Sequence, residues 1–330
     1  MSIPPLLSFV LVADHQLKPA AVKLHVAEDN RYALLPLIAD KNFSALVAEF
    51  PCLIDASLAQ GLPAELLTAL QETGCQLILD EHVHYSDGQE KPVLPPTAHW
   101  LAGDWYLALP AKRSASQAAS RSLSLKLLQL VASDAETREI EAIFRQDPVL
   151  AYHLLRLVNS FGVGVGRYIS SFSQAILILG RQQLKRWLNL MLFAASRDDH
   201  RSAMLLARVA VRARTLELLA KATGQDRALQ DLAFMAGMFS LLGILFGLPL
   251  ADILSPLKLN ESLSRAVLDH EGVLGRLLQA VESAENADEA TLARLIGDFG
   301  LTIADYIPLN VEAYQWMLGV IHEKKDAVDA

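Results

Sequence analysis

The chain has 330 residues, 52% of them hydrophobic and 20% charged, so it can bury a large core and is not a disordered chain. Its net charge of −8 and pI near 5.6 argue against a general nucleic-acid-binding protein. The first apolar run follows no basic segment, so we expect no signal peptide. Cys52 and Cys75 indicate buried thiols in a reducing compartment rather than a disulfide or a zinc site. We therefore expect a cytoplasmic protein.

Residues 1–110 mix short apolar runs, strand-like or ambiguous in type, with turn residues. Pro63–Thr73 places leucines at helical spacing, and Gly74 follows as a residue that can end the helix. The run CQLILD after it predicts a buried strand, and WYLALP (105–110) predicts a last short strand. This order predicts a small α/β domain.

Residues 111–121 contain no large apolar residue and predict a linker. Residues 122–330 then follow a helical period almost throughout, which predicts an all-α domain and a mainly α chain. Helices are expected over 200–223, 227–246, 261–269, 273–284, 288–298 and 303–323, after five between 123 and 196. Leu232–Leu250 holds no charge; we interpret it as a central buried helix rather than a membrane span.

Two segments of the helical part carry ordered polar and glycine positions. In the first, Asp147 and Pro148 suit an N-cap and the first helical position, and Asn159 and Ser160 stand where the apolar stripe ends. From the residues alone we interpret this as a buried helix with a polar last turn; the alternative is a polar notch that contacts a partner or ligand. In the second, Gly180 allows a close turn between two amphipathic helices.

These runs, DPVLAYHLLRLVNS and ISSFSQAILILGRQQLKRW, resemble the HDOD domain over about residues 122–320. HDOD domains are divergent relatives of HD-type phosphohydrolases that occur in bacterial signalling proteins. The resemblance implies an HDOD-type fold with a protein-interaction or output role and no enzymatic activity. The motif or interaction residues that it implies are Asp147, Pro148, Asn159, Ser160, Gly180, Arg181 and Trp187.

The active relatives bind metal with an adjacent His and Asp on the central helix. At the aligned positions this chain has Ser240 and Leu241, and neither can replace those ligands. The resemblance therefore implies a pseudo-phosphohydrolase with no metal and no cofactor. His270 is placed where a downstream ligand could be, so residual phosphohydrolase activity stays open as a third hypothesis.

Between residues 181 and 214 there are eight Lys or Arg and two Asp, a local net charge of +6. Arg201, Arg208 and Arg212 share one helix face by their spacing. Our first interpretation is a solvated face, with the acidic C-terminal third as its candidate partner. The alternative is a surface that binds an acidic partner or a cyclic dinucleotide such as cyclic di-GMP. We expect a protein partner in a signalling pathway, and no nucleic acid or membrane.

Pieces of residues 1–110 resemble a shortened EAL domain, a domain that degrades cyclic di-GMP. FVLVADHQLKPAAVKLHV is similar to the opening strand pair of that domain, and GDWYLALP to its last strand. The Glu-Ala-Leu signature is absent, with LHV at the comparable place, and Asp80-Glu81 is an adjacent acidic pair that could mimic a metal site. The resemblance implies a degenerate EAL-like domain without catalytic metal.

Overall fold

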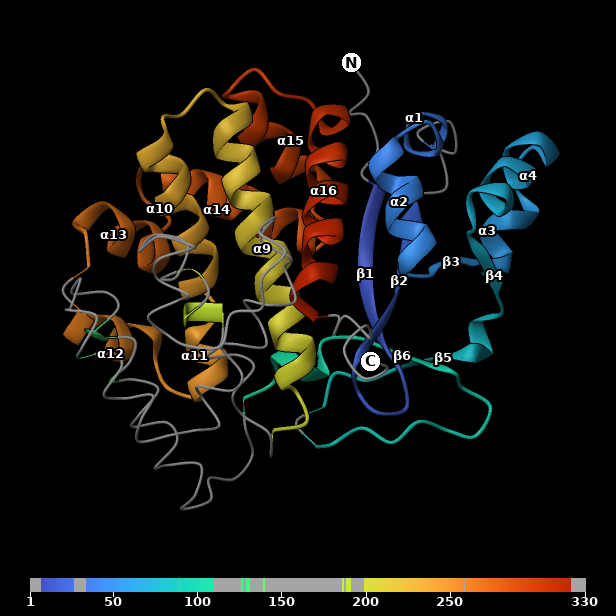
Figure 1. The fold of residues 1–330 in the computed structure, drawn as a ribbon, viewed down its shortest axis with the longest axis horizontal. Helices are drawn as coiled ribbons and strands as arrows, with labels where there is room; N and C mark the ends of the chain where they lie inside the picture. Colours follow the sequence, from blue (N-terminus) through green and yellow to red (C-terminus); the bar gives the residue numbers. More distant parts are fainter. Residues whose placement is uncertain are drawn as a thin grey trace, which may run out of the picture.

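A computed structural model describes residues 7–26, 34–88, 90–109, 199–257 and 259–321, together with a few positions between 126 and 190. The described part confirms a mainly α chain with a small α/β region at its N-terminal end (Figure 1). The linker at 111–121, the two motif segments and nearly all of the helices expected between 123 and 196 lie outside the described residues.

The α/β region is built on a six-stranded sheet with the order β4-β3-β2-β1-β6-β5. The first two strands pair antiparallel along their length, whereas β2, β3 and β4 are parallel neighbours. Among the described residues, β1 pairs with β6 only at Ala13↔Leu101, so most of that edge of β1 has no neighbouring strand there. The strands are β1 (Leu7–Ala13), β2 (Pro19–Val26), β3 (Cys52–Asp55), β4 (Gln76–Ile78), β5 (Val83–Tyr85) and β6 (Trp100–Ala102).

Four helices accompany the sheet: α1 (Leu34–Ile38), α2 (Lys41–Glu49), α3 (Ala56–Gln60) and α4 (Ala64–Thr73). The Asp40 carboxylate caps α2 by accepting from the amides of Asn42 and Phe43. Gly74 ends α4 in the left-handed conformation, with φ of 104°, and a strand follows as β4. The prediction of a buried strand there is wrong, because only Ile78 of β4 is buried. The two ambiguous apolar runs at 34–49 are therefore helices rather than strands.

The strand predicted at WYLALP is wrong. The last strand is β6, Trp100–Ala102, and Trp105–Leu107 forms a single turn of 3-10 helix, η3. Two consecutive aromatic residues, Trp105 and Tyr106, are both buried in this turn. Gly103, at φ of 96°, makes the bend between the two elements.

The helical region packs around α9 (Ser202–Ala222), which is buried on nearly every side and contacts α10, α14 and α16 (Figure 1). Its boundaries match the prediction for 200–223, and those of α13–α16 match within about two residues. The other helices are α10 (Arg227–Phe239), α11 (Leu242–Phe246), α12 (Leu250–Leu254), α13 (Glu261–Asp269), α14 (Gly272–Glu285), α15 (Glu289–Gly297) and α16 (Ile303–Ile321).

The apolar stretch Leu232–Leu250 is not one central helix. It breaks at Ser240 and Leu241 into α10 and α11, and Gly247 ends α11 in the left-handed conformation. By length and composition Arg227–Phe246 could cross a membrane, but 56% of its most apolar window is buried inside the protein, as in a core helix. The centre of the helical packing is α9 instead, because α10, α14 and α16 all pack against it.

The sheet and the helical region share one hydrophobic core. α16 packs against α2, and α9 contacts β1 and β2. Phe9 of β1 stands between the two regions: its ring centroid lies 6.2 Å from that of Phe43 in α2 and 5.5 Å from that of Tyr314 in α16. These ring contacts join the sheet to the helical region, and a cavity lies at their junction.

Candidate functional site

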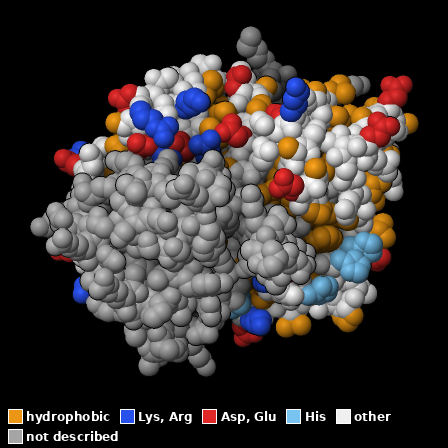
Figure 2. Space-filling model, in the orientation of Figure 1, with side chains coloured by type: hydrophobic (Ala, Val, Ile, Leu, Met, Phe, Trp, Pro, Cys, Tyr) orange, Lys and Arg blue, Asp and Glu red, His pale blue; other side chains and the backbone are white. Residues whose placement is uncertain are grey.

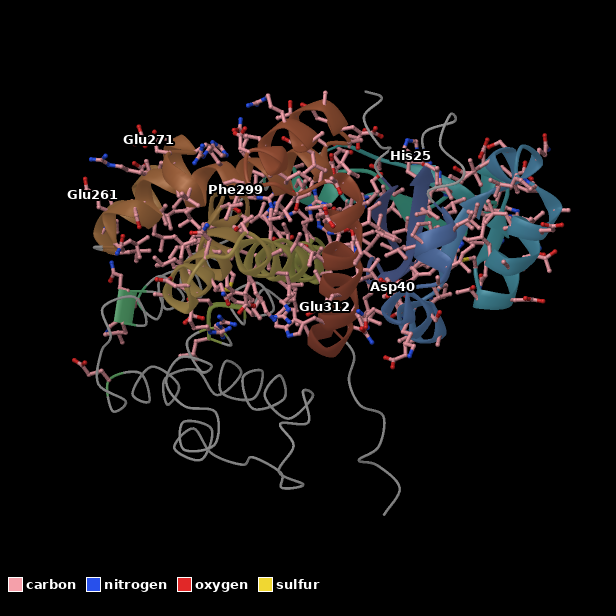
Figure 3. All side chains as sticks on the ribbon, turned by 90° about the horizontal axis from the view of Figure 1, so that it is seen from above. His25, Asp40, Glu261, Glu271, Phe299 and Glu312 are labelled. Carbon is pink, nitrogen blue, oxygen red and sulfur yellow. The ribbon has the colours of Figure 1, made fainter. Side chains whose placement is uncertain are left out.

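A cavity of about 330 Å³ lies where the sheet meets the helices. Residues of β1, β2 and β5 line one side, and residues of α9, α14 and α16 line the other. Figure 3 marks His25, one of the residues on the sheet side. The volume is at the lower end of the range of about 300–1,000 Å³ typical of small-molecule sites.

Lys23 is the cation of the sheet side. Its ammonium group contacts a carboxylate oxygen of Asp55 at 2.9 Å and donates to the hydroxyl of Tyr85 at 2.5 Å. Burial works to lower the pKa of Lys23, but the bonds to Tyr85 and Asp55 raise it above its ordinary value. Lys23 therefore stays protonated. His25 follows two residues later on the same face of β2 and is exposed.

Arg208 of α9 is the cation of the helix side. Its side chain is 11% exposed and lies 3.1 Å from the Glu285 carboxylate. Burial works to lower the pKa of Arg208, but Glu285 raises it overall. The Nε–H of Arg208 is buried and has no hydrogen-bond partner among the described residues. A buried donor without an acceptor costs free energy, so this group is suited to an acceptor supplied by a ligand.

Glu285 also receives the guanidinium of Arg212, whose Nε lies 3.1 Å from both carboxylate oxygens. Burial works to raise the pKa of Glu285, but Arg208 and Arg212 together lower it below its ordinary value. The carboxylate is therefore ionised, and with Glu282, which also contacts Arg212, two arginines face two glutamates. Arg212 remains a partner for Glu285 if Arg208 turns toward a ligand.

The remaining wall is aromatic and polar. Tyr306 and Tyr314 of α16 are buried, and their pKa values are raised chiefly by burial, so both hydroxyls stay neutral. Thr215 and Asn310 also line the cavity and are hydrogen bonded to each other at 3.2 Å. The cavity thus offers aromatic rings and neutral donors and acceptors between two fixed cations, a combination that suits a ligand with a ring and one or two phosphate groups.

The three arginines predicted to share a face do not form a solvated one. Arg201, Arg208 and Arg212 are only 2%, 9% and 7% exposed. Arg201 binds Asp199 and the main-chain oxygen of Ala108. The other two pair with acidic residues after position 251, because α14 packs directly on α9. On the face shown in Figure 2, basic and acidic side chains stand next to each other rather than in separate patches.

The two positions aligned with metal ligands are part of the core. The Ser240 hydroxyl accepts from Arg212 at 2.8 Å and donates to the carbonyl of Gly237, and Leu241 is buried. His270 lies 2.7 Å from Glu282, which in turn contacts Arg212. Among the described residues, no group of three or more His, Cys, Asp or Glu side chains is arranged to hold a metal ion.

The other predicted site residues, Asp147, Pro148, Asn159, Ser160, Gly180, Arg181 and Trp187, lie outside the described residues. Lys23, Tyr85 and Glu285 were not predicted from the sequence. A lysine inside the otherwise apolar run AVKLHV was a usable signal, since a buried charge needs a partner. Nothing in the sequence indicated that the partners would be Asp55 and Tyr85.

Residues 121–266 match the family model of the HDOD domain. A protein of Vibrio cholerae serotype O1 named cyclic di-GMP phosphodiesterase CdgJ is 31% identical over 178 residues, which cover 54% of this chain and 40% of the relative. The uncharacterized Bacillus subtilis protein YuxH is 27% identical over 201 residues, which cover 60% of this chain and 48% of the relative. The matched part therefore spans less than half of either relative.

Among solved structures, a candidate phosphohydrolase from Shewanella amazonensis SB2B matches with a TM-score of 0.40 and 16% identity, over 60% of this chain and 93% of that one. The Vibrio cholerae relative is named as an enzyme, which contradicts the expectation that this chain has no enzymatic activity. That expectation rested on the HDOD resemblance and on Ser240 and Leu241 at the aligned metal-ligand positions, and such positions do not report on catalytic groups elsewhere. The family match is specific to one part of the molecule: the chain contains an HDOD domain over residues 121–266.

Proposed function

We propose that this chain acts in cyclic di-GMP signalling and binds a guanosine phosphate ligand in the cavity between the sheet and the helical region. The observation that carries the proposal is Arg208: it lines a cavity that also holds Lys23, and its buried Nε–H has no hydrogen-bond partner among the described residues. The similarity to a relative named as a cyclic di-GMP phosphodiesterase supports the choice of ligand.

The charges favour a phosphodiester over a polyphosphate. Lys23 and Arg208 each keep a carboxylate partner, Asp55 and Glu285, so the site has little net positive charge to offset several phosphate charges. A phosphodiester carries one negative charge per phosphate, and its oxygens can accept from an arginine fork. The cavity's size suits one nucleotide half of the dinucleotide. His25 lines the cavity and is exposed to solvent.

The test is calorimetric titration of the purified protein with cyclic di-GMP. We expect a 1:1 complex that weakens as salt rises, because charged groups bind the phosphate. Arg208→Met keeps most of the apolar stem and removes the guanidinium. Losing a hydrogen bond to a charged group costs about 1.5–3 kcal/mol, so the Kd should rise roughly ten- to a hundredfold.

Arg265→Met is the matched control, because Arg265 is an exposed arginine on α13 that pairs with Glu261 and does not line the cavity. Its Kd should equal that of the unchanged protein. If Arg208→Met and the unchanged protein bind cyclic di-GMP with equal affinity, and circular dichroism shows that both are folded, the ligand does not bind in this cavity. No heat of binding at tens of micromolar cyclic di-GMP would show that cyclic di-GMP is not the ligand.

A second candidate function is hydrolysis of cyclic di-GMP, which the similarity to the Vibrio cholerae relative favours. It is tested by incubating the protein with cyclic di-GMP and magnesium or manganese and separating the nucleotides by chromatography. Appearance of the linear dinucleotide in proportion to protein concentration supports the activity. If the substrate peak stays unchanged over many hours in a preparation that binds cyclic di-GMP, the protein binds this nucleotide without hydrolysing it.

A further inference from the structure

The two cysteines of the chain come together in the sheet. Cys52 opens β3, and Cys75 directly precedes β4. These strands are parallel neighbours with Leu53 opposite Gln76, so the register places Cys52 opposite Cys75. Neighbouring strands are about 4.8 Å apart, within the Cα separation of about 4.4–6.8 Å that a disulfide needs.

Both thiols point to the same side of the sheet. They belong to the large core, whereas Leu53, the residue after Cys52, belongs to the small core on the opposite side. Each thiol shifts the pKa of the other, as only neighbouring side chains do, and both cysteines are free. The pair is therefore a close thiol contact and not merely two buried cysteines.

The end of α4 fixes Cys75 in place. Gly74 takes the left-handed conformation, and the amide of Cys75 donates to the carbonyl of Leu70 at 3.0 Å. Contact with Cys52 lowers the pKa of the Cys75 thiol. Contact with Cys75, together with burial, raises the pKa of the Cys52 thiol. Cys75 is also the more exposed of the two, at 6% against 0%. Cys75 is thus the better nucleophile of the pair.

We propose that Cys52 and Cys75 are a modification site: a thiol pair that a hydroperoxide oxidises reversibly to an intramolecular disulfide in the folded protein. The Cys75 thiolate attacks one peroxide oxygen, the O–O bond breaks, and Cys75 becomes a sulfenic acid while the other oxygen leaves as water or an alcohol. The Cys52 sulfur then attacks the Cys75 sulfur. The S–S bond forms, the S–O bond breaks, and water leaves with the Cys52 proton.

Two thiols thereby give two electrons to one peroxide, and a dithiol reductant reverses the reaction. In a reducing compartment such a disulfide is transient, which is the behaviour of a redox sensor. The bond would close the β3–α3–α4–β4 crossover into a covalent loop. The proposal is independent of the ligand site, because it depends only on the register of β3 and β4.

The experiment treats the native, full-length protein with hydrogen peroxide, stops the reaction with acid, and alkylates in denaturant. We expect the intact mass to fall by two hydrogen atoms with loss of both alkylation sites, and peptide mapping to link Cys52 to Cys75. The rate should not depend on protein concentration. Dithiothreitol should restore both thiols, and the oxidised protein should have a higher Tm because the cross-link restricts the unfolded chain.

Two variants test the order of the steps. In Cys52→Ser, the Cys75 sulfenic acid has no partner and should be trapped by dimedone, whereas Cys75→Ser should give little dimedone adduct and keep an alkylatable Cys52. Two alkylatable thiols after peroxide treatment of the folded protein would overturn the proposal. So would a disulfide that forms only between two chains, seen as a dimer on a non-reducing gel.

Discussion

Tyr314 donates its hydroxyl hydrogen to the main-chain carbonyl of Phe9 across 2.7 Å, and so joins α16 to the first strand of the sheet. β1 pairs with β6 only through Ala13, so its outer edge needs donors from elsewhere. The tyrosine supplies one while its ring packs on the Phe9 ring. This contact lies on the wall of the cavity, so it couples the stability of the junction to the shape of the site.

Tyr314→Phe removes this bond and leaves the ring in place. The buried carbonyl of Phe9 then has no donor from α16, and we expect the free energy of unfolding to fall by about 1–3 kcal/mol. Denaturant unfolding should show a lower midpoint with an unchanged slope. Tyr306→Phe is the control, because Tyr306 lies on the same helix and is equally buried, but its hydroxyl makes no hydrogen bond to another described residue. Equal losses in the two variants would contradict the role of the Tyr314 hydroxyl.

Gly237 lets α10 approach α9 closely. A Cβ atom at this position would lie 2.6 Å from the Cα of Ala213, nearer than two carbon atoms can pack. Gly237→Ala should therefore push the helices apart and lower the free energy of unfolding by about 1–3 kcal/mol or more. Gly297→Ala is the opposite case, because no atom lies within 4 Å of its Cβ at the end of α15, and it should be neutral or stabilising. Thermal unfolding of both variants checks the contrast; equal Tm values would mean that the crossing can relax.

The sequence predicts the helices of the C-terminal region well because their apolar residues repeat at the helical period and their ends carry caps. Asn260 and Asp288, for example, accept from backbone amides at the starts of α13 and α15. Short elements were harder. The run at 34–38 is apolar on both faces, so periodicity does not separate helix from strand. The turn at Trp105 depends on packing against the rest of the molecule, including His200, whose ring stacks on it.

The candidate site was the least predictable part. Arg208 was recognised as a candidate, but its partner Glu285 is 77 positions later in the sequence. Glu285 lies on α14, and no local sequence pattern predicts that α14 packs against α9. Lys23 meets Asp55 and Tyr85 only because β2, β3 and β5 converge in one sheet. The same holds for Cys52 and Cys75, which strand register brings together. Long-range pairing of this kind is a property of the fold, so the residue types were available from the sequence and their contacts were not.

Glu285 makes the free energy of unfolding depend on pH in the acidic range. It is buried between Arg208 and Arg212, and these cations hold its pKa below the ordinary value although burial alone raises it. A carboxyl whose pKa is lower in the folded state stabilises the fold at pH values above its unfolded pKa of about 4.3. That stabilisation is lost as the pH falls through the folded value. We therefore expect the unfolding free energy to drop below about pH 4 partly because Glu285 takes up a proton.

Glu285→Gln isolates this contribution. At pH 7 the variant leaves the buried guanidinium of Arg208 without a carboxylate and that of Arg212 with Glu282 alone, and we expect a loss of about 3–5 kcal/mol. Because glutamine does not titrate, the gap between the unchanged protein and the variant should narrow as the pH falls below about 4. Denaturant unfolding from pH 7 down to pH 3 measures the gap. Glu261→Gln, which breaks only the exposed pair with Arg265, should follow the unchanged protein throughout. A gap for Glu285→Gln that stays constant over the whole range would show that Arg208 and Arg212 do not depend on an ionised Glu285.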